Sequence, residues 1–290
     1  MLLLESVPNF SEGRDQATID AIGSALSRRA RLLDVHTDVD HNRSVFTLVG
    51  SEDELADALV EVVAVAAERI DLRLHGGAHP RIGAADVVPI VPLEPGDFER
   101  ARVAAALVGA RIGAELGLPV FMYAPPERGP AFYRRGGPAA LQERIDAGEV
   151  VVDFGPARLH ESAGGVIVGA RAPLIAFNVN LRGTLDAARA IAAVVRERGG
   201  GFPGVRALGL DLPSAGLVQV SMNVEDWQAA PLHEIVARIA AEAEARGAQV
   251  AGSELVGLLP AGAAAAAAGQ ALRLEGLDAS RVLEARLLEL

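Results

Sequence analysis

The order of predicted strands and helices repeats along this chain, and no other feature limits its fold as strongly. In the first half, short apolar runs predict strands and helical spacing of apolar residues predicts two helices between them. The strands fall at 2–8, 31–36, 44–50 and 86–92, and the helices at 15–29 and 51–69. The order is therefore β-α-β-β-α-β, a split motif in which two helices cover one face of a sheet.

The second half gives the same order without clear repetition of the residues themselves. Its predicted strands lie at 172–181, 205–210, 216–223 and 248–260, and its helices at 184–198 and 231–246. We therefore predict an α+β fold of two ferredoxin-like (βαββαβ) subdomains, with mixed, largely antiparallel sheets and helices packed on one face. The predicted subdomains span residues 1–171 and 172–290.

The segment between the two repeats is less regular. A helix is predicted over 96–117, a strand over 118–124 and a short helix over 141–150. Residues 125–138 are rich in proline, glycine and arginine without periodicity, which predicts a connector or a lid that moves. The irregular stretch 153–165 is a second candidate binding loop. Near the end of the sequence, an alanine-rich helix (262–271) and a closing helix (280–288) are predicted.

Composition restricts the class of protein. The 290 residues are 50% hydrophobic, yet no apolar run approaches the roughly 20 residues that span a membrane. With no cysteine and no export signal, we expect a cytoplasmic protein that does not bind membranes. The formal charge of −11 argues against nucleic-acid binding, so small molecules are the expected partners. No lysine occurs, so every basic side chain is an arginine, which suits carboxylate binding and excludes Schiff-base chemistry.

Residues 75–90, HGGAHPRIGAADVVPI, are the leading candidate for a catalytic segment. His75 and His79 are four residues apart, but the glycines and Pro80 between and beside them disfavour a helix. We predict a tight loop that places a histidine, which titrates near neutrality, next to the anion-binding fork of Arg81. An ordinary connecting loop remains the alternative.

A second polar group follows the predicted strand at 31–36 and includes His36, Asp38, Asp40, His41 and Arg43. Two histidines and a carboxylate are a usual metal-ligand set, so a metal site is one interpretation. Turn formation is the other, because aspartate favours turns. The chain has no nucleophile elbow, Walker sequence or glycine-rich dinucleotide motif. Acid–base catalysis by a histidine, with arginines holding an anionic substrate, is the enzyme mechanism that remains.

Six segments of the sequence resemble the formiminotransferase domain family. They are ESVPNFSEGRD (5–15), HNRSVFTLVG (41–50), HGGAHPRIGAADVVPIVPL (75–93), DFGP (153–156), LIAFNVNL (174–181) and SELVGLLP (253–260). The resemblance is to the stand-alone, bacterial-type form and runs in order over most of the chain. It implies a homodimer of paired α/β subdomains that transfers the formimino group of N-formimino-L-glutamate to tetrahydrofolate in histidine degradation. It also implies that tetrahydrofolate is the co-substrate and that no metal is required.

The resemblance implies roles for particular residues. The catalytic histidine, a general base and acid, is His79. The resemblance also places folate binding at Gly155, Pro156, His160, Ser162, Gly164 and Arg171. As our own hypothesis of the mechanism, Arg43 and Arg81 hold the carboxylates of the donor. In the same hypothesis the other substrate-binding residues, Asn9, His36 and Asp38, orient His79 or bind the amidinium. A structural role stays open for each binding residue. Three other functions also stay open: a folate-dependent formyl transferase, a formimino hydrolase and a non-catalytic folate-binding protein.

Overall fold

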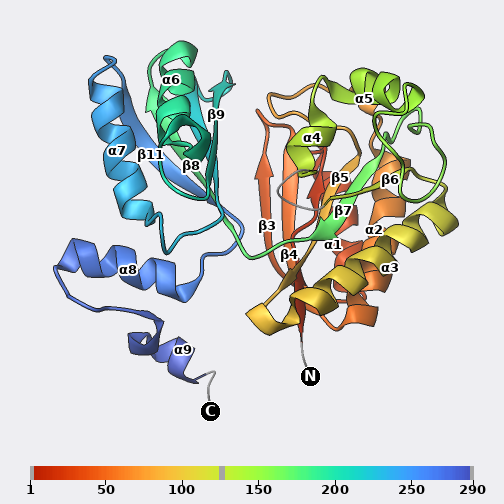
Figure 1. Ribbon diagram of the computed structural model, residues 1–290, viewed down its shortest axis with the longest axis horizontal. Helices are drawn as coiled ribbons and strands as arrows, with labels where there is room; N and C mark the ends of the chain where they lie inside the picture. The colour runs from red at the N-terminus through yellow and green to blue at the C-terminus, as the bar shows by residue number, and fades with distance from the viewer. Residues whose placement is uncertain (1–2, 124–127, 288–290) are drawn as a thin grey trace. The chain divides into compact units, whose positions relative to one another are not determined.

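The computed structural model describes residues 3–123 and 128–287. It divides into two compact units, Met1–Pro173 and Leu174–Leu290, and each is described by itself. Figure 1 shows that each unit contains a sheet with helices packed against it. The two sheets have separate hydrophobic cores, so each unit buries its own apolar side chains.

The first unit contains one mixed sheet, which comprises seven strands within the described residues. Its order is β3, β4, then β1 and β2 end to end, then β5, β7 and β6. The pairings among β1 to β5 are antiparallel, whereas β7 pairs in parallel with both β5 and β6. The strands are β1 (Leu4–Ser6), β2 (Asn9–Phe10), β3 (Arg31–Asp38), β4 (Arg43–Gly50), β5 (Ala85–Pro92), β6 (Val120–Met122) and β7 (Val166–Ala170).

Three helices cover one face of this sheet: α1 (Gln16–Ser27), α2 (Glu52–Arg69) and α3 (Phe98–Leu116). A capping box formed by Ser51 and Glu54 fixes the start of α2. Phe10, Phe46 and Leu48 point from the strands into the core shared with these helices. Because side chains alternate along a strand, the neighbours Asn9, Arg43 and Val45 lie on the opposite face.

The opposite face is covered over β5, β6 and β7 by two short helices, α4 (Pro130–Arg134) and α5 (Gly137–Asp146). Their side chains form a smaller core with the strands, made of Ile82, Val87, Phe121, Tyr133, Leu141 and Ile167 among others. The arrangement leaves β2, β3 and β4 to present polar side chains on this face.

Several predictions for the first unit were wrong in detail. The strand predicted over 2–8 ends at Ser6, and Asn9 lies in β2 rather than in a turn. Strand β7 was not predicted at all, because its five buried residues follow directly after a glycine-containing loop. Part of the predicted loop 125–138 is helical, in α4 and the start of α5. The rest of that prediction includes residues 125–127, which lie outside the described residues.

The second unit follows the prediction closely. Its antiparallel sheet has the order β11, β8, β10, β9, and helices α6 and α7 pack on one face. The elements are β8 (Ile175–Arg182), α6 (Leu185–Val195), β9 (Val205–Leu212), β10 (Leu217–Val224), α7 (Leu232–Glu244) and β11 (Gln249–Val256). Helix α8 (Ala261–Leu272) is the predicted alanine-rich helix, and α9 (Leu283–Leu287) is shorter than the predicted closing helix.

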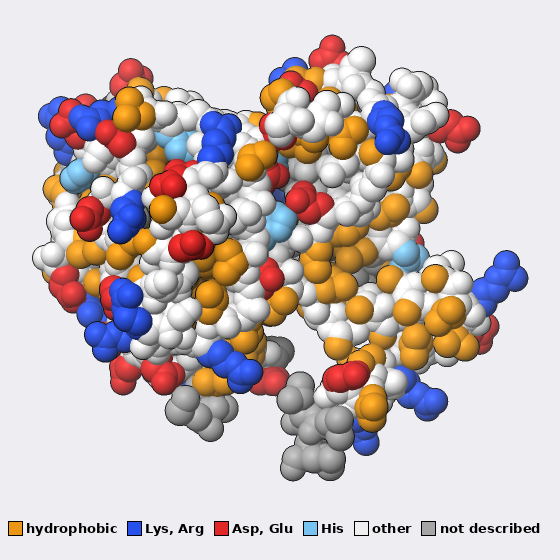
Figure 2. Space-filling model, turned by 180° about the vertical axis from the view of Figure 1, so that it is seen from behind, with side chains coloured by type: hydrophobic (Ala, Val, Ile, Leu, Met, Phe, Trp, Pro, Cys, Tyr) orange, Lys and Arg blue, Asp and Glu red, His pale blue; other side chains and the backbone are white. Residues whose placement is uncertain are grey.

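Both units carry the β-α-β-β-α-β order, so the predicted fold class is confirmed. The first unit extends that motif with α3 and the parallel strands β6 and β7. A search of the described helices finds none long and apolar enough to cross a membrane. On the face of the molecule shown in Figure 2, acidic and basic side chains are interspersed.

Candidate active site

Three loops meet at one end of strands β2, β4 and β5 because polar groups of one loop bind the backbone of the next. The side chain of Asn42 accepts a hydrogen bond from the Gly13 amide (2.9 Å) and donates one to the Gly76 carbonyl (3.1 Å). The Ala78 amide donates to the Asp40 carbonyl at 3.1 Å. Asn42 has a φ of 47°, in the left-handed region that asparagine tolerates better than most residues. These contacts hold His79 next to β4.

His79 lies in the predicted loop and is held as a neutral imidazole. Its Nδ1 lies 2.8 Å from the Pro80 carbonyl oxygen, which can only accept, so Nδ1 carries the proton. Nε2 then accepts a hydrogen bond from Nη1 of Arg43 at 2.6 Å. Burial and the positive charges of Arg43 and Arg134 hold the pKa of His79 well below its usual value. The ring is half-buried, and the lone pair of Nε2 is occupied by the N–H of Arg43.

Arg43 is a half-buried cation whose partners are neutral. One Nη donates to His79 and the other to Oδ1 of Asn9, whose own amino group is held by the Val7 carbonyl at 2.7 Å. The Nε atom of Arg43 is buried without a hydrogen-bond partner. Burial, together with the charges of Arg134 and Arg81, lowers the pKa of Arg43 to about 9. Across the described residues, no carboxylate forms an ion pair with this guanidinium.

Arg81 binds the loops together rather than pointing away from them. Its guanidinium donates to the carbonyl oxygens of Asn42 (2.9 Å), His41 (2.7 Å) and His79 (2.8 Å). A further N–H contacts the ring of His75 at 3.0 Å. Burial and the charge of Arg81 lower the pKa of His75. In this arrangement each guanidinium nitrogen of Arg81 has a partner.

A buried ion pair between Asp86 and Arg134 lies beside these residues and was not predicted. The Nε of Arg134 donates to Oδ2 of Asp86 at 2.9 Å, and the side chains are only 4% and 14% exposed, with Asp86 the more buried. Oδ1 of Asp86 accepts from the Ile82 amide at 2.8 Å. Asp86 lies between the two β5 residues that pair with β2, where the register shifts. A bulge of this kind redirects a side chain next to a site.

Asp38 and His36 lie on strand β3, on the same face as Arg43. Asp38 is paired in register with Arg43, and His36 is paired with Val45. One carboxylate oxygen of Asp38 accepts from the His41 amide at 2.7 Å, and the other lies 3.4 Å from His41 Nδ1. The structure therefore brings His79, Asn9, Arg43, Asp38 and His36 to one face and one end of the first sheet.

The predicted folate loop crosses the sheet edge at which β5, β6 and β7 begin. The amide of Leu72 donates to the Ser162 carbonyl (2.8 Å), and the amide of Ala84 donates to the Ala163 carbonyl (2.9 Å). The loop thus lies against the segments that flank the catalytic loop. Pro156 and His160 are exposed, Ser162 is half-buried, and Gly164 is buried.

Two glycines of this loop adopt a backbone conformation that other residues rarely take. Gly155 and Gly164 have positive φ values of 81° and 69°. A Cβ at Gly164 would lie 2.0 Å from the Ile82 carbonyl oxygen, and one at Gly155 would lie 2.2 Å from that of Leu118. Both are needed for close packing. Arg171 lies at the opposite end of the parallel strands, where its amide donates to the Ile90 carbonyl at 3.1 Å, so the structure does not group it with the others.

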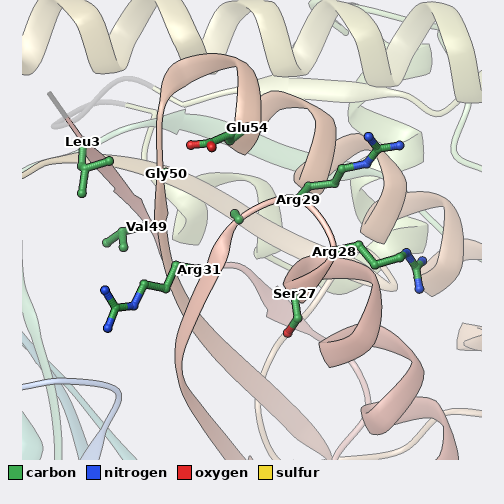
Figure 3. A pocket seen from close by; sticks show the side chains of 9 residues that line it. Leu3, Ser27, Arg28, Arg29, Arg31, Val49, Gly50 and Glu54 are labelled. Carbon is green, nitrogen blue, oxygen red and sulfur yellow. The ribbon is translucent and has the colours of Figure 1, made fainter. Parts of the chain in front are cut away.

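A hollow of about 440 Å³ lies elsewhere in the first unit, where β3 begins and β4 ends. Figure 3 shows that the guanidinium groups of Arg28 and Arg31, two of its lining residues, point in opposite directions. Arg28 is paired with Glu61. None of the predicted site residues lines this hollow. In the part of the chain that the structure describes, no group of three histidine or acidic side chains is placed to hold a metal ion.

A neutral histidine beside an arginine that has no acid partner among the described residues is an arrangement suited to proton transfer on an anionic substrate. Comparison with known proteins agrees. The family model described as "Formiminotransferase domain, N-terminal subdomain" matches residues 3–171, and that described as "Formiminotransferase domain" matches residues 176–283.

Named relatives lead to the same family. The chain is 38% identical over 295 residues to the glutamate formimidoyltransferase of Streptococcus pyogenes serotype M1, covering 99% of both chains. It is 38% identical over 300 residues to the enzyme of that name from Thermoplasma acidophilum, covering 99% of this chain and 98% of the relative. It is 39% identical over 272 residues to the formimidoyltransferase-cyclodeaminase of Gallus gallus, covering 89% of this chain and 50% of that protein.

The chain belongs to the formiminotransferase domain family and is a transferase. The predicted family and enzyme class are confirmed. Sequence reasoning missed Asp86 and Arg134 as neighbours of the site. Their only signal was an aspartate at the start of an otherwise apolar strand, because a charge there needs a partner when it is buried.

Proposed function

We propose that the protein transfers the formimino group from N-formimino-L-glutamate to tetrahydrofolate, giving 5-formiminotetrahydrofolate and L-glutamate, in histidine degradation. The names of the two nearly full-length relatives and both family models support this reaction. The observation that carries the proposal is the guanidinium of Arg43, whose Nε is buried without a partner, which lacks a carboxylate among the described residues and which adjoins the neutral ring of His79.

Arg43 holds a carboxylate of the donor. A buried cation without a counter-ion is costly, and an anionic ligand relieves that cost. The unpartnered Nε–H of Arg43 supplies a donor for this purpose. The formimino group is an amidine and is cationic when protonated, so the carboxylate of Asp38 on the same face suits it. Asn9 orients Arg43 through their hydrogen bond, and His36 lines the same face.

His79 moves the proton at Nε2, whose lone pair becomes available when the donor carboxylate takes over the N–H of Arg43 that occupies it in the free protein. As N5 of tetrahydrofolate attacks the formimino carbon, Nε2 takes the proton that N5 loses. The carbon–nitrogen bond to glutamate then breaks, and His79 returns the proton to the departing amine, so that charge and protons balance. A positioned base of this kind contributes about 10²–10⁴-fold to the rate.

Donor binding and the basicity of His79 are coupled. In the free protein, burial and the charge of Arg43 depress the pKa of His79. A donor carboxylate on Arg43 offsets that charge and raises the pKa of His79 toward neutrality, where a general base is most effective. Arg81 was predicted to hold a second carboxylate. Its contacts to three carbonyl oxygens favour a positioning role, in which it keeps His79 beside Arg43.

Tetrahydrofolate lies along the loop 155–164 in this proposal. His160 and Ser162 offer polar groups there, while Gly155, Pro156 and Gly164 shape the backbone. Arg171 fits poorly with this group, because it lies at the other end of β7. No metal enters the mechanism. The cytoplasmic location and the homodimer remain predictions from the sequence and from the family resemblance.

A product assay tests the proposal. Purified protein is given N-formimino-L-glutamate with and without tetrahydrofolate, and both glutamate and 5-formiminotetrahydrofolate are measured. We expect the two products in equal amounts and only when both substrates are present. Glutamate release without tetrahydrofolate would indicate a hydrolase instead. Folate binding without turnover of this donor would contradict the proposed reaction.

A further inference from the structure

One arginine beside the active site uses only part of its guanidinium group. Nε and Nη2 of Arg134, the last residue of α4, both donate to Oδ2 of Asp86, the first at 2.9 Å. These two nitrogens form one edge of the planar group, so the outer edge, made by Nη1 and the second N–H of Nη2, is directed away from Asp86. Nη1 makes no hydrogen bond within the described residues, and it is not closed off from solvent. Arg134 therefore has donors left for a ligand.

The neighbours of Arg134 hold its side chain in place. Oδ1 of Asp86 accepts from the Ile82 amide while Oδ2 accepts from Arg134, so the carboxylate is fixed at both oxygens. Tyr133, the preceding residue of α4, is buried, and its hydroxyl donates to the Met122 carbonyl at 2.8 Å. A side chain held in this way loses little further conformational entropy when it binds a ligand.

Arg134 lies on the face of the first sheet that carries Arg43. Asp86 lies at the bulge of β5, where this strand pairs with Asn9 of β2, and the side chain of Asn9 accepts from Arg43. Helix α4 covers part of the same face, opposite α1, α2 and α3. Burial is the first cause of the lowered pKa of both Arg43 and His79, and the charge of Arg134 is a further cause. Such an effect requires charges that are close together.

The positive charges on this face exceed the acids that pair with them. Within the described residues, Asp86 is the one carboxylate that forms an ion pair with Arg43, Arg81 or Arg134. The carboxylate of Asp38, on the same face, accepts from the backbone of its own turn. The whole protein carries a formal charge of −11, so this local excess of positive charge is not a general property of the chain. It favours an anion with more than one acidic group.

The proposed donor carries two carboxylates, and the proposed function provides a partner for one of them, at Arg43. Arg81 is not available for the other, because each of its guanidinium nitrogens already has a partner. We infer that Arg134 binds the second carboxylate of N-formimino-L-glutamate through the outer edge of its guanidinium group. Arg134 then selects a dicarboxylic donor over one with a single carboxylate. This inference rests on the proposed function for the identity of the donor.

Donor binding in the absence of tetrahydrofolate tests this inference separately from the transfer. The probes are N-formimino-L-glutamate and its two monoamides, in which a neutral amide replaces the α- or the γ-carboxylate. Calorimetric titration of the full chain gives the affinity for each probe.

Two variants change Arg134 in different ways. Arg134→Lys keeps a cation beside Asp86 and removes the outer edge. The double variant Asp86→Asn/Arg134→Met removes both charges and retains an acceptor for the Ile82 amide. Arg135→Lys, at the next and exposed position, is the matched control. Thermal unfolding reports whether each variant is folded.

We expect both Arg134 variants to bind N-formimino-L-glutamate at least about tenfold more weakly than the wild type, and Arg135→Lys to bind it with unchanged affinity. Each monoamide should bind the wild type more weakly than the diacid does. The monoamide that lacks the carboxylate bound by Arg134 should lose no further affinity in the Arg134 variants.

Two results would overturn the inference: an unchanged affinity of the Arg134 variants for the diacid, or equal losses of affinity for the diacid and both monoamides. If the product assay shows transfer and the Arg134 variants keep the wild-type donor affinity, the inference fails and the proposed reaction stands. If the expected binding pattern appears without transfer, the carboxylate site stands and the proposed reaction fails.

Discussion

The two sheets share the β-α-β-β-α-β order, but they present different side chains on the face opposite α1, α2 and α3 in the first unit and opposite α6 and α7 in the second. In the first unit, the central strands present a cation, Arg43, next to Asn9 and beside a histidine. In the second unit, the corresponding strands present amides joined to Glu254. Each face buries a polar atom without a partner, Arg43 Nε in one and Gln219 Oε1 in the other. A repeated backbone order thus carries two different sets of polar side chains, a cation in the first unit and amides in the second.

The two buried atoms without a partner differ in chemistry, since Arg43 Nε is a hydrogen-bond donor and Gln219 Oε1 is an acceptor. A buried N–H of a guanidinium selects an acceptor, preferably a carboxylate, whereas a buried carbonyl oxygen selects a donor. The first face therefore suits the acidic donor and the proton transfer. The second suits a group that donates a hydrogen bond. Four further changes break or sharpen this contrast.

The largest effect is expected from His79→Ala in the first unit. Removing the base should lower the transfer rate by about 10²–10⁴-fold, because no other group takes the N5 proton. His233, on α7 of the second unit, provides the matched control, and His233→Ala should change the rate less than about twofold. Steady-state rates at saturating substrates measure both. If the transfer rate of His79→Ala stayed within a few fold of the wild-type rate, His79 could not be the base that takes the proton.

The second largest effect is expected from the ion pair of Asp86 and Arg134 beside the site. Asp86→Asn leaves Arg134 buried without its counter-ion, so the free energy of unfolding should fall by about 3–5 kcal/mol. Asp57→Asn breaks the more exposed pair with Arg111 and should cost about 0–1 kcal/mol. Urea unfolding of the two variants gives the comparison. Equal losses would show that burial of the Asp86 pair adds nothing.

A smaller loss is expected where two loops touch. A Cβ at Gly77 would lie 2.3 Å from the His41 carbonyl oxygen, whereas nothing lies within 4 Å of one at Gly76. Gly77→Ala should therefore shift the catalytic loop, destabilise the fold by about 1–3 kcal/mol and slow transfer. Gly76→Ala should stay within about 0.5 kcal/mol. Thermal unfolding and rates of this pair show whether the contact holds His79 in place.

Lowering the pH should reduce the free energy of unfolding of the first unit, and this is the smallest of the four expected effects. The pKa of both His79 and His75 is lowered in the folded state, so between that value and about 6.5 the unfolded chain binds more protons. Stability is then complete above about pH 6.5 and decreases as the pH falls, by at most about 1.4 kcal/mol per pH unit for each histidine. Hydrogen exchange at pH 7 and 5.5 locates the loss. An equal loss of protection against hydrogen exchange in both units would contradict this prediction.

Most of the fold could be predicted from the sequence, because both repeats have clear strand and helix periodicity. Strand β7 could not, since five apolar residues next to glycines are too short to distinguish from a loop. The loop around His75 and His79 was predicted because Gly76, Gly77 and Pro80 disfavour a helix there. The separate short strand β2 was not predicted, although Phe10 anchors it in the core.

The network around His79 could not be predicted in the same way. Arg134 and Asp86 are 48 residues apart, and nothing local in the sequence indicates that an arginine of a short helix reaches a strand. The hydrogen bonds of the Arg81 guanidinium to carbonyl oxygens also depend on how separate loops pack together. Local patterns therefore identify the reactive residues, and tertiary contacts decide which of them remain available to a ligand.

The most direct test of the coupling between the two central residues is the pKa of His79, measured by NMR titration of its ring with and without N-formimino-L-glutamate. The free protein should show a value well below 6.5, held there by burial and by Arg43. Saturating donor should raise that value by at least about one unit, and Arg43→Met should raise it in the free protein and abolish the response to donor. An unchanged pKa on donor binding would contradict the placement of a donor carboxylate on Arg43.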